Sequence, residues 1–114
     1  MESILTSIKK MLGIAEEYVH FDPDIILCIN SALSILTQLG VGPEEGFAIR
    51  NAAPTWMDFI GDDLRIEMVK SYMHLKVRLL FDPPVGAALL AAMERQVSEL
   101  EWRLNVAVDP EEGG

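Results

Sequence analysis

Residues 22–40, DPDIILCINSALSILTQLG, predict a long α-helix. Asp22 is a good N-cap, Pro23 suits the first helical position, and Asp24 complements the positive end of the helix dipole. Apolar side chains then recur every three or four residues, namely Ile25, Ile26, Ile29, Leu33, Leu36 and Leu39. The sequence Gly40-Val41-Gly42-Pro43 ends the pattern. This amphipathic helix needs other elements to cover its apolar face.

Two shorter helices are predicted on either side of this one. Residues 2–12 place apolar side chains at helical spacing, and Gly13 supplies a stop. A second short helix spans Trp56 to Ile60, where Thr55 can act as N-cap and Asp58 stands at the third helical position.

Residues 64–81 and 86–104 predict two more long helices, which the sequence Asp82-Pro83-Pro84 separates. The expected core stripe of the first is Leu64, Met68, Tyr72, Leu75 and Leu79; Val69, Met73, Lys76 and Leu80 flank it, so the apolar face is wide and the helix is expected to be central. The expected stripe of the second is Leu89, Met93, Val97, Leu100 and Leu104. The fold class is therefore all-α, a small helical bundle of about three long helices plus one or two short ones. We assign residues 1–104 to a single α-helical domain and residues 105–114 to an acidic, flexible C-terminal tail.

The chain has 114 residues, and its nine basic and 18 acidic side chains give a formal net charge of −9. This acidity argues against a protein that clamps nucleic-acid phosphates, which requires clustered Lys and Arg. No stretch approaches the roughly 18 apolar residues of a membrane span, and the N-terminus has no signal-peptide core. We therefore expect no membrane association, and the cytoplasm of the producing cell is the expected compartment.

The residues that carry chemistry in other proteins favour structural roles here. The adjacent carboxylates, such as Glu16-Glu17 and Glu44-Glu45, fall in loops or at helix ends, where acids are solvated. Cys28, the only cysteine, lies on an apolar helix without a predicted base partner. His20 precedes a helix and is expected to be exposed. We predict no enzymatic activity, no metal and no cofactor.

Charge is distributed unevenly along the chain. The helix over 64–81 holds Arg65, Lys70, Lys76 and Arg78, and His74 lies in one column with Lys70 and Arg78, whereas loops and tail are acidic. Complementary patches suit head-to-tail self-association, but ordinary pairing with the many acids is the equal alternative. Trp56 and Trp102 pose a similar choice, since aromatic residues at helical spacing are usually core and Trp is also an interface anchor.

Residues 70–84, KSYMHLKVRLLFDPP, resemble the characteristic stretch of small head–tail connector proteins from tailed phages and prophages of Gram-positive hosts. Four further segments resemble the same family: DIILCINSAL at 24–33, LGVG at 39–42, WMDF at 56–59 and ELEWRL at 99–104. The resemblance extends over residues 4–104, nearly the whole chain.

The resemblance implies a structural virion protein without catalytic activity or cofactor. Copies would form a ring, twelvefold in the family, that docks below the portal protein, extends the DNA channel and presents a surface to the downstream head–tail joining or tail protein. The protein would lie at the head–tail junction of the virion, and in the host bacterial cytoplasm before assembly. Loops and tail ends make many ring contacts in the family, which makes Phe47, Ile49 and the stretch after Leu104 expected interface.

A conduit for DNA should not bind it tightly, and an acidic channel wall would repel phosphates and let the duplex pass without specific binding. The alternative function is a small α-helical adaptor or regulatory interaction module that acts as a monomer or dimer. A small hydrolase that uses an acidic cluster is the remaining alternative, although the sequence shows no convergent carboxylates.

Overall fold

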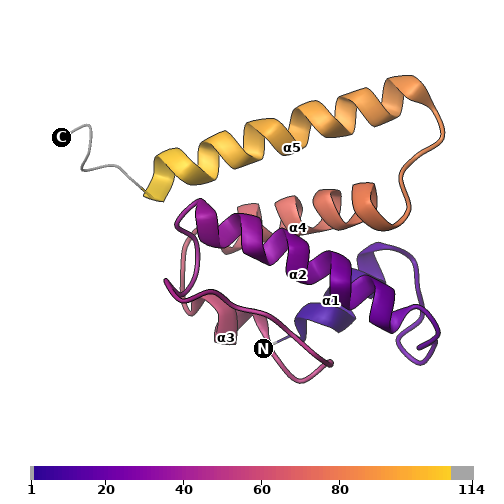
Figure 1. Ribbon diagram of the computed structural model, residues 1–114, viewed down its shortest axis with the longest axis horizontal. Helices are drawn as coiled ribbons and strands as arrows, with labels where there is room; N and C mark the ends of the chain where they lie inside the picture. Colours follow the sequence, from indigo (N-terminus) through magenta and orange to yellow (C-terminus); the bar gives the residue numbers. More distant parts are fainter. Residues whose placement is uncertain (1, 109–114) are drawn as a thin grey trace.

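The computed structural model describes residues 2–108, which form five α-helices and contain no β-strand. The helices are α1 (Ile4–Met11), α2 (Asp22–Gln38), α3 (Trp56–Ile60), α4 (Ile66–Phe81) and α5 (Ala87–Val108). The long helices α2 and α4 pack against each other in the middle of the molecule; α5 packs on α4 along one side, and α1 and α3 lie on the opposite side (Figure 1). The prediction of a small all-α bundle is confirmed.

The predicted caps hold at α3 and change at α2. At α3 the Thr55 hydroxyl accepts a hydrogen bond from the Asp58 backbone N–H at 3.1 Å, and the Asp58 carboxylate accepts one from the Thr55 N–H at 2.9 Å. At α2 the N-cap is Phe21 and has no side-chain cap, so Asp22 is the first helical residue and not the cap. The cap prediction for Asp22 is wrong because its carboxylate is drawn to Lys9.

The last helix is longer than the minimum expected from the sequence. Helix α5 continues through residues 105–108, which we had assigned to the start of the tail. Residues 109–114, the acidic remainder of that tail, lie outside the described part of the chain. Its flexibility therefore stays a prediction.

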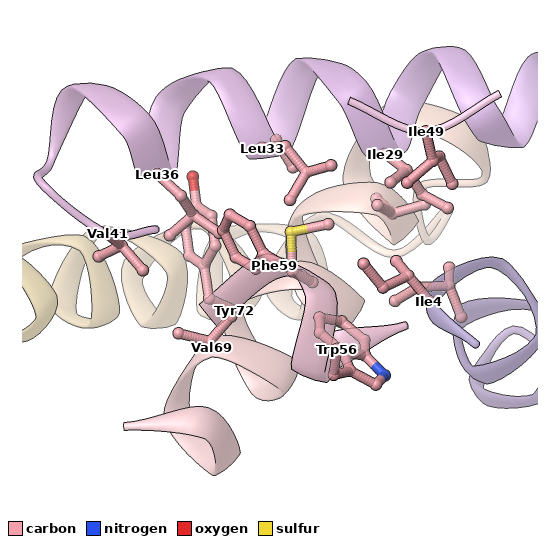
Figure 2. Packing of buried hydrophobic residues seen from close by; sticks show 14 of the residues in the cluster. Ile4, Ile29, Leu33, Leu36, Val41, Ile49, Trp56, Phe59, Val69 and Tyr72 are labelled. Atoms are coloured by element: carbon pink, nitrogen blue, oxygen red, sulfur yellow. The ribbon is translucent and has the colours of Figure 1, made fainter. Parts of the chain in front are cut away.

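The hydrophobic core lies between α2, α4 and the short helices (Figure 2). Phe59 of α3 reaches the middle of this core, between Leu33 and Leu36 of α2 and Val69 of α4 (Figure 2). Trp56, on the same short helix, is fully buried beside Ile4 of α1. The short helices thus close the side of the α2–α4 pair that α5 leaves uncovered.

The buried face of α4 is shifted from the predicted stripe toward the residues predicted to flank it. The buried residues of α4 are Val69, Tyr72, Met73 and Val77. Of the predicted stripe only Tyr72 is fully buried, whereas Met68, Leu75 and Leu79 are half-buried. Leu64 lies outside the helix and is completely exposed. Because α4 is apolar around much of its circumference, its sequence period does not decide which side faces α2 and α5.

A buried lysine joins the first helix to the start of the second. The Lys9 side chain is 3% exposed, and its Nζ lies 2.9 Å from Asp22 Oδ1. The same Nζ donates hydrogen bonds of 2.8 Å to the backbone carbonyls of Glu16 and Tyr18. Lys9 therefore holds α1, the connector over residues 13–21 and the N-terminus of α2 together, since a buried cation requires all of these acceptors.

The segment after α2 covers one edge of the core. Ile49 is buried, and Asn30 of α2 makes two hydrogen bonds to its backbone: the Ile49 N–H donates to Asn30 Oδ1 at 2.8 Å, and Asn30 Nδ2 donates to the Ile49 carbonyl at 2.9 Å. Phe47 packs against Phe59, with 5.3 Å between ring centroids. Gly42, four residues after the end of α2, has a φ of +85° and lies directly against the Phe59 ring.

We expect Lys9→Met to lower the free energy of unfolding by about 3 kcal/mol, because it leaves Asp22 without its buried counter-charge and two backbone carbonyls without a donor. Urea denaturation followed by circular dichroism measures the change. Lys10→Met is the matched control, since Lys10 is exposed and should change stability by less than about 0.5 kcal/mol. Equal effects of the two substitutions would show that the buried cluster does not stabilise the fold.

Two glycines give a matched pair for a second stability measurement. Gly13 and Gly42 have similar positive φ values, +80° and +85°, but a Cβ at Gly13 meets open space and one at Gly42 clashes with the Phe59 ring. Gly13→Ala should cost about 1 kcal/mol from backbone strain alone. Gly42→Ala should cost at least about 1 kcal/mol more, because Phe59 must move within the core. Equal losses in thermal denaturation would show that Phe59 relocates freely.

Candidate interaction surfaces

The basic residues predicted on α4 do not form one surface. Arg65 is bound to Asp63 of the preceding loop, with distances of 2.7 and 3.0 Å from its guanidinium nitrogens to the two carboxylate oxygens. The hydrogen bonds from Arg65 lower the pKa of Asp63, so the pair keeps both charges over a wide pH range and largely neutralises itself. Arg65 therefore pairs with an acid of its own chain, which was the alternative to a contact with another copy.

Lys70, His74 and Arg78 form the predicted column along α4, spaced by four residues and half-buried. Lys76 is two residues from both His74 and Arg78, which places it on a different side of the helix. Burial, helped by the Arg78 charge, lowers the pKa of His74, so its imidazole stays neutral at pH 7. Arg78 Nε donates to the Asp82 carbonyl at 3.0 Å and thereby closes the last turn of α4. The column carries two charges and serves partly as local structure.

Two of the predicted interface residues belong to the core. Ile49 is 1% exposed because Asn30 anchors its backbone against α2, and Trp56 is fully buried because the capping box turns α3 inward. Lys70 Nζ lies 5.9 Å from the centroid of the Trp56 ring, within cation–π range. Phe47 is half-buried on Phe59. The expectation of Ile49 at an interface is therefore corrected, and Trp56 follows the core alternative.

Trp102, in contrast, lies on the outside of α5 and is 66% exposed. Its neighbour Glu101 accepts a hydrogen bond of 2.8 Å from the buried Tyr72 hydroxyl of α4. Leu104, two residues after Trp102, is fully buried. These two attachments set the rotation of α5, so that Trp102 and, one turn further, Val106 (48% exposed) face away from the bundle.

An apolar groove, which we did not predict, opens where α1 ends, α2 begins and α4 ends. It has a volume of about 670 Å³ and is lined by Leu12, Ile14, Phe21, Asp24, Leu27, Cys28, Leu80, Phe81 and Asp82. The rings of Phe21 and Phe81 meet edge to face at 5.6 Å, and Leu27 is 69% exposed. The groove joins residues that lie more than fifty positions apart in the sequence. The local signal for it is limited to the apolar residues around Phe21 and Leu27.

Residues 2–108 contain no group of three or more side chains that could hold a metal ion. Burial, together with the charge of Asp24, raises the pKa of the Cys28 thiol, which therefore stays protonated and unreactive at neutral pH. No helix in the described part of the chain is long and apolar enough to cross a membrane. The exposed apolar surfaces are thus the features that suggest interaction.

Comparison with known proteins gives one family. The family model described as "Phage connector protein" matches residues 4–111. No curated protein and no solved structure matches the chain. The matched segment includes all five helices, and therefore also the groove and the exposed end of α5.

The bond between Tyr72 and Glu101 gives stability a pH dependence in the alkaline range. Burial, aided by this hydrogen bond, raises the pKa of Tyr72 far above its usual value, whereas in the unfolded chain the phenol loses its proton near pH 10. The stabilisation is therefore complete below about pH 10 and falls as pH rises above it, by up to about 1.4 kcal/mol per pH unit.

We expect Tyr72→Phe to flatten this alkaline loss when the free energy of unfolding is measured between pH 8 and pH 11.5. Tyr18→Phe, which removes the only other tyrosine, is the control and should keep the wild-type slope. If wild type and Tyr72→Phe show the same slope above pH 10, the buried hydroxyl does not link α4 to α5.

Proposed function

The chain belongs to the phage connector protein family, which gives it a structural role in the phage particle, and on this premise we propose that it is a ring-forming subunit of the head–tail connector. Copies assemble beneath the portal protein, extend the DNA channel and present a surface on which the next tail-side protein docks. The family match over residues 4–111 is the observation that carries this proposal. The role is non-catalytic and needs no cofactor.

The shape and surface of the chain support such a role. The Cα trace measures 47 × 36 × 19 Å, so the subunit is a flat plate that can stand side by side with neighbours. Large apolar side chains remain exposed in the groove and on α5, as expected for a subunit that buries surface only after assembly. We retain a twelvefold ring as the expectation from the family resemblance.

The charge of the chain supports passage of DNA without specific binding. The net charge of −9 leaves the surface predominantly acidic, and the basic residues of α4 are divided between an ion pair, a half-buried column and a separate side. A ring of such subunits repels phosphates from its inner wall, so a packaged duplex slides through it without being gripped.

The apolar groove also favours a second candidate, a small adaptor that binds an apolar segment of another protein as a monomer or dimer. The two functions differ in what the protein binds. A connector binds the portal and joins further copies of itself, whereas an adaptor binds one segment in a one-to-one complex.

Deletion of the gene from the phage that encodes this chain tests the proposed function. We expect capsids that package DNA but carry no tails, because the surface between portal and tail is missing; electron microscopy of the lysate counts such heads. Expression of the chain in trans should restore tailed particles. Normal tailed particles in the deletion strain would contradict the connector role and leave the adaptor as the better candidate.

A further inference from the structure

The chain has two exposed apolar surfaces at opposite ends of its longest axis. One is the groove defined above, at the end where α1 ends, α2 starts and α4 ends. The other is the C-terminal part of α5, where Trp102, Arg103 and Val106 are exposed; we call these three residues the α5 knob. In Figure 1 the start of α2 and the end of α5 lie at the two ends of the long horizontal axis.

The groove combines an apolar floor with an acidic rim. Phe21, Leu27 and Leu80 are each more than a third exposed there. Asp24 and Asp82 stand at the edge, and neither has a cation within ion-pair distance in the described part of the chain. A ligand that fits this groove presents an apolar group together with a positive charge.

The α5 knob offers this combination. Trp102 and Val106 are four residues apart and therefore project from the same face of the helix. Arg103 stands beside them, and its only ion pair in the described residues is with Glu99, 2.8 Å away, with both side chains more than half exposed. An exposed i,i+4 pair is weak, so the guanidinium is free to exchange this partner for another carboxylate.

We propose that the α5 knob of one copy seats in the groove of the next, with the Trp102 indole on the apolar floor and the Arg103 guanidinium toward Asp24 and Asp82. This inference rests on the proposed function and names the surfaces by which the copies join. Trp and Arg are the residue types that dominate binding energy at interfaces, and the two matched surfaces bring complementary charge.

The placement of the two surfaces determines the kind of assembly. They differ from each other and lie at opposite ends of the plate, so their contact is heterologous: each copy uses its knob on one neighbour and its groove on the other. Such contacts add copies without limit until rotation closes them into a ring. Stable interfaces bury about 800 Å² on each partner, so we expect a contact of three knob residues in one groove to be weak between free copies.

Cross-linking between cysteines tests the pairing. In a Cys28→Ser background, Leu27→Cys places a thiol in the groove and Val106→Cys places one on the knob; both positions are exposed and lie outside the core. The full chain is treated with a short bis-maleimide at about 1 mM, where even a contact with a Kd near 1 mM is about 40% populated. The double variant should give a ladder of dimers, trimers and larger species.

The controls separate this contact from random collision. Each single-cysteine variant reacts at one position only and should stop at the dimer. Leu27→Cys combined with Glu94→Cys moves the α5 thiol about 18 Å along the helix from position 106 and should give no ladder beyond the single variants. Adding Trp102→Ala to the double variant should reduce the trimer about tenfold or more, whereas Leu64→Ser, which removes a fully exposed leucine elsewhere, should leave it unchanged.

Each outcome either supports or overturns the contact between the α5 knob and the groove. A ladder that depends on positions 27 and 106 and on Trp102 supports the pairing. A double variant that gives no more trimer than the controls overturns it. Binding of the wild-type chain to purified portal protein, scored by co-sedimentation, is read separately: portal binding without a ladder rejects the knob-and-groove contact and keeps the connector role, whereas a ladder without portal binding rejects that role and keeps the contact.

Discussion

One buried positive charge, that of Lys9, fixes the packing at the end of the molecule where α1 ends and α2 begins. The arrangement of the other helices depends on this end. Lys9 is 3% exposed, and a cation that is removed from water must find acceptors on every side. It finds the Asp22 carboxylate and two carbonyls of the connector over residues 13–21. This requirement closes the connector over α1 and sets where α2 begins, so that Phe21 meets Phe81 and the apolar groove takes its shape.

Helix α4 connects this end of the molecule to the end that carries the exposed part of α5, because it packs against both α2 and α5. It packs on α2 through one part of its surface and on α5 through another, and the Tyr72 hydroxyl reaches Glu101 across the second contact. Three long helices that run lengthwise give a plate with distinct ends, one concave and acidic at its rim, the other a helix surface with an exposed indole. These two different ends are the basis of the head-to-tail contact that we propose between copies.

The structure changes the interpretation of the uneven charge distribution along the sequence. Arg65 is satisfied within its own loop by Asp63, and the neutral His74 leaves Lys70 and Arg78 as the charges of the α4 column. The surfaces that remain for partners are mainly apolar, with carboxylates at their edges. In the proposed connector, the excess of acid would act mainly through repulsion of DNA from the channel and less through individual contacts.

The sequence alone determined the features that depend on neighbouring residues: the all-α class, the existence and approximate ends of the helices, the capping box of Thr55 and Asp58, and the apolar face of α2. Helix periodicity and caps depend on residues only a few positions apart, so a short stretch of sequence is enough to predict them. Only the tertiary structure decided which side of α4 is buried, that Ile49 and Trp56 serve the core, that Lys9 is an internal cation, and that residues 12–28 and 80–82 enclose a groove. Each of these depends on segments distant in sequence competing for the same space and the same hydrogen-bond partners, and that competition is resolved only when the helices pack.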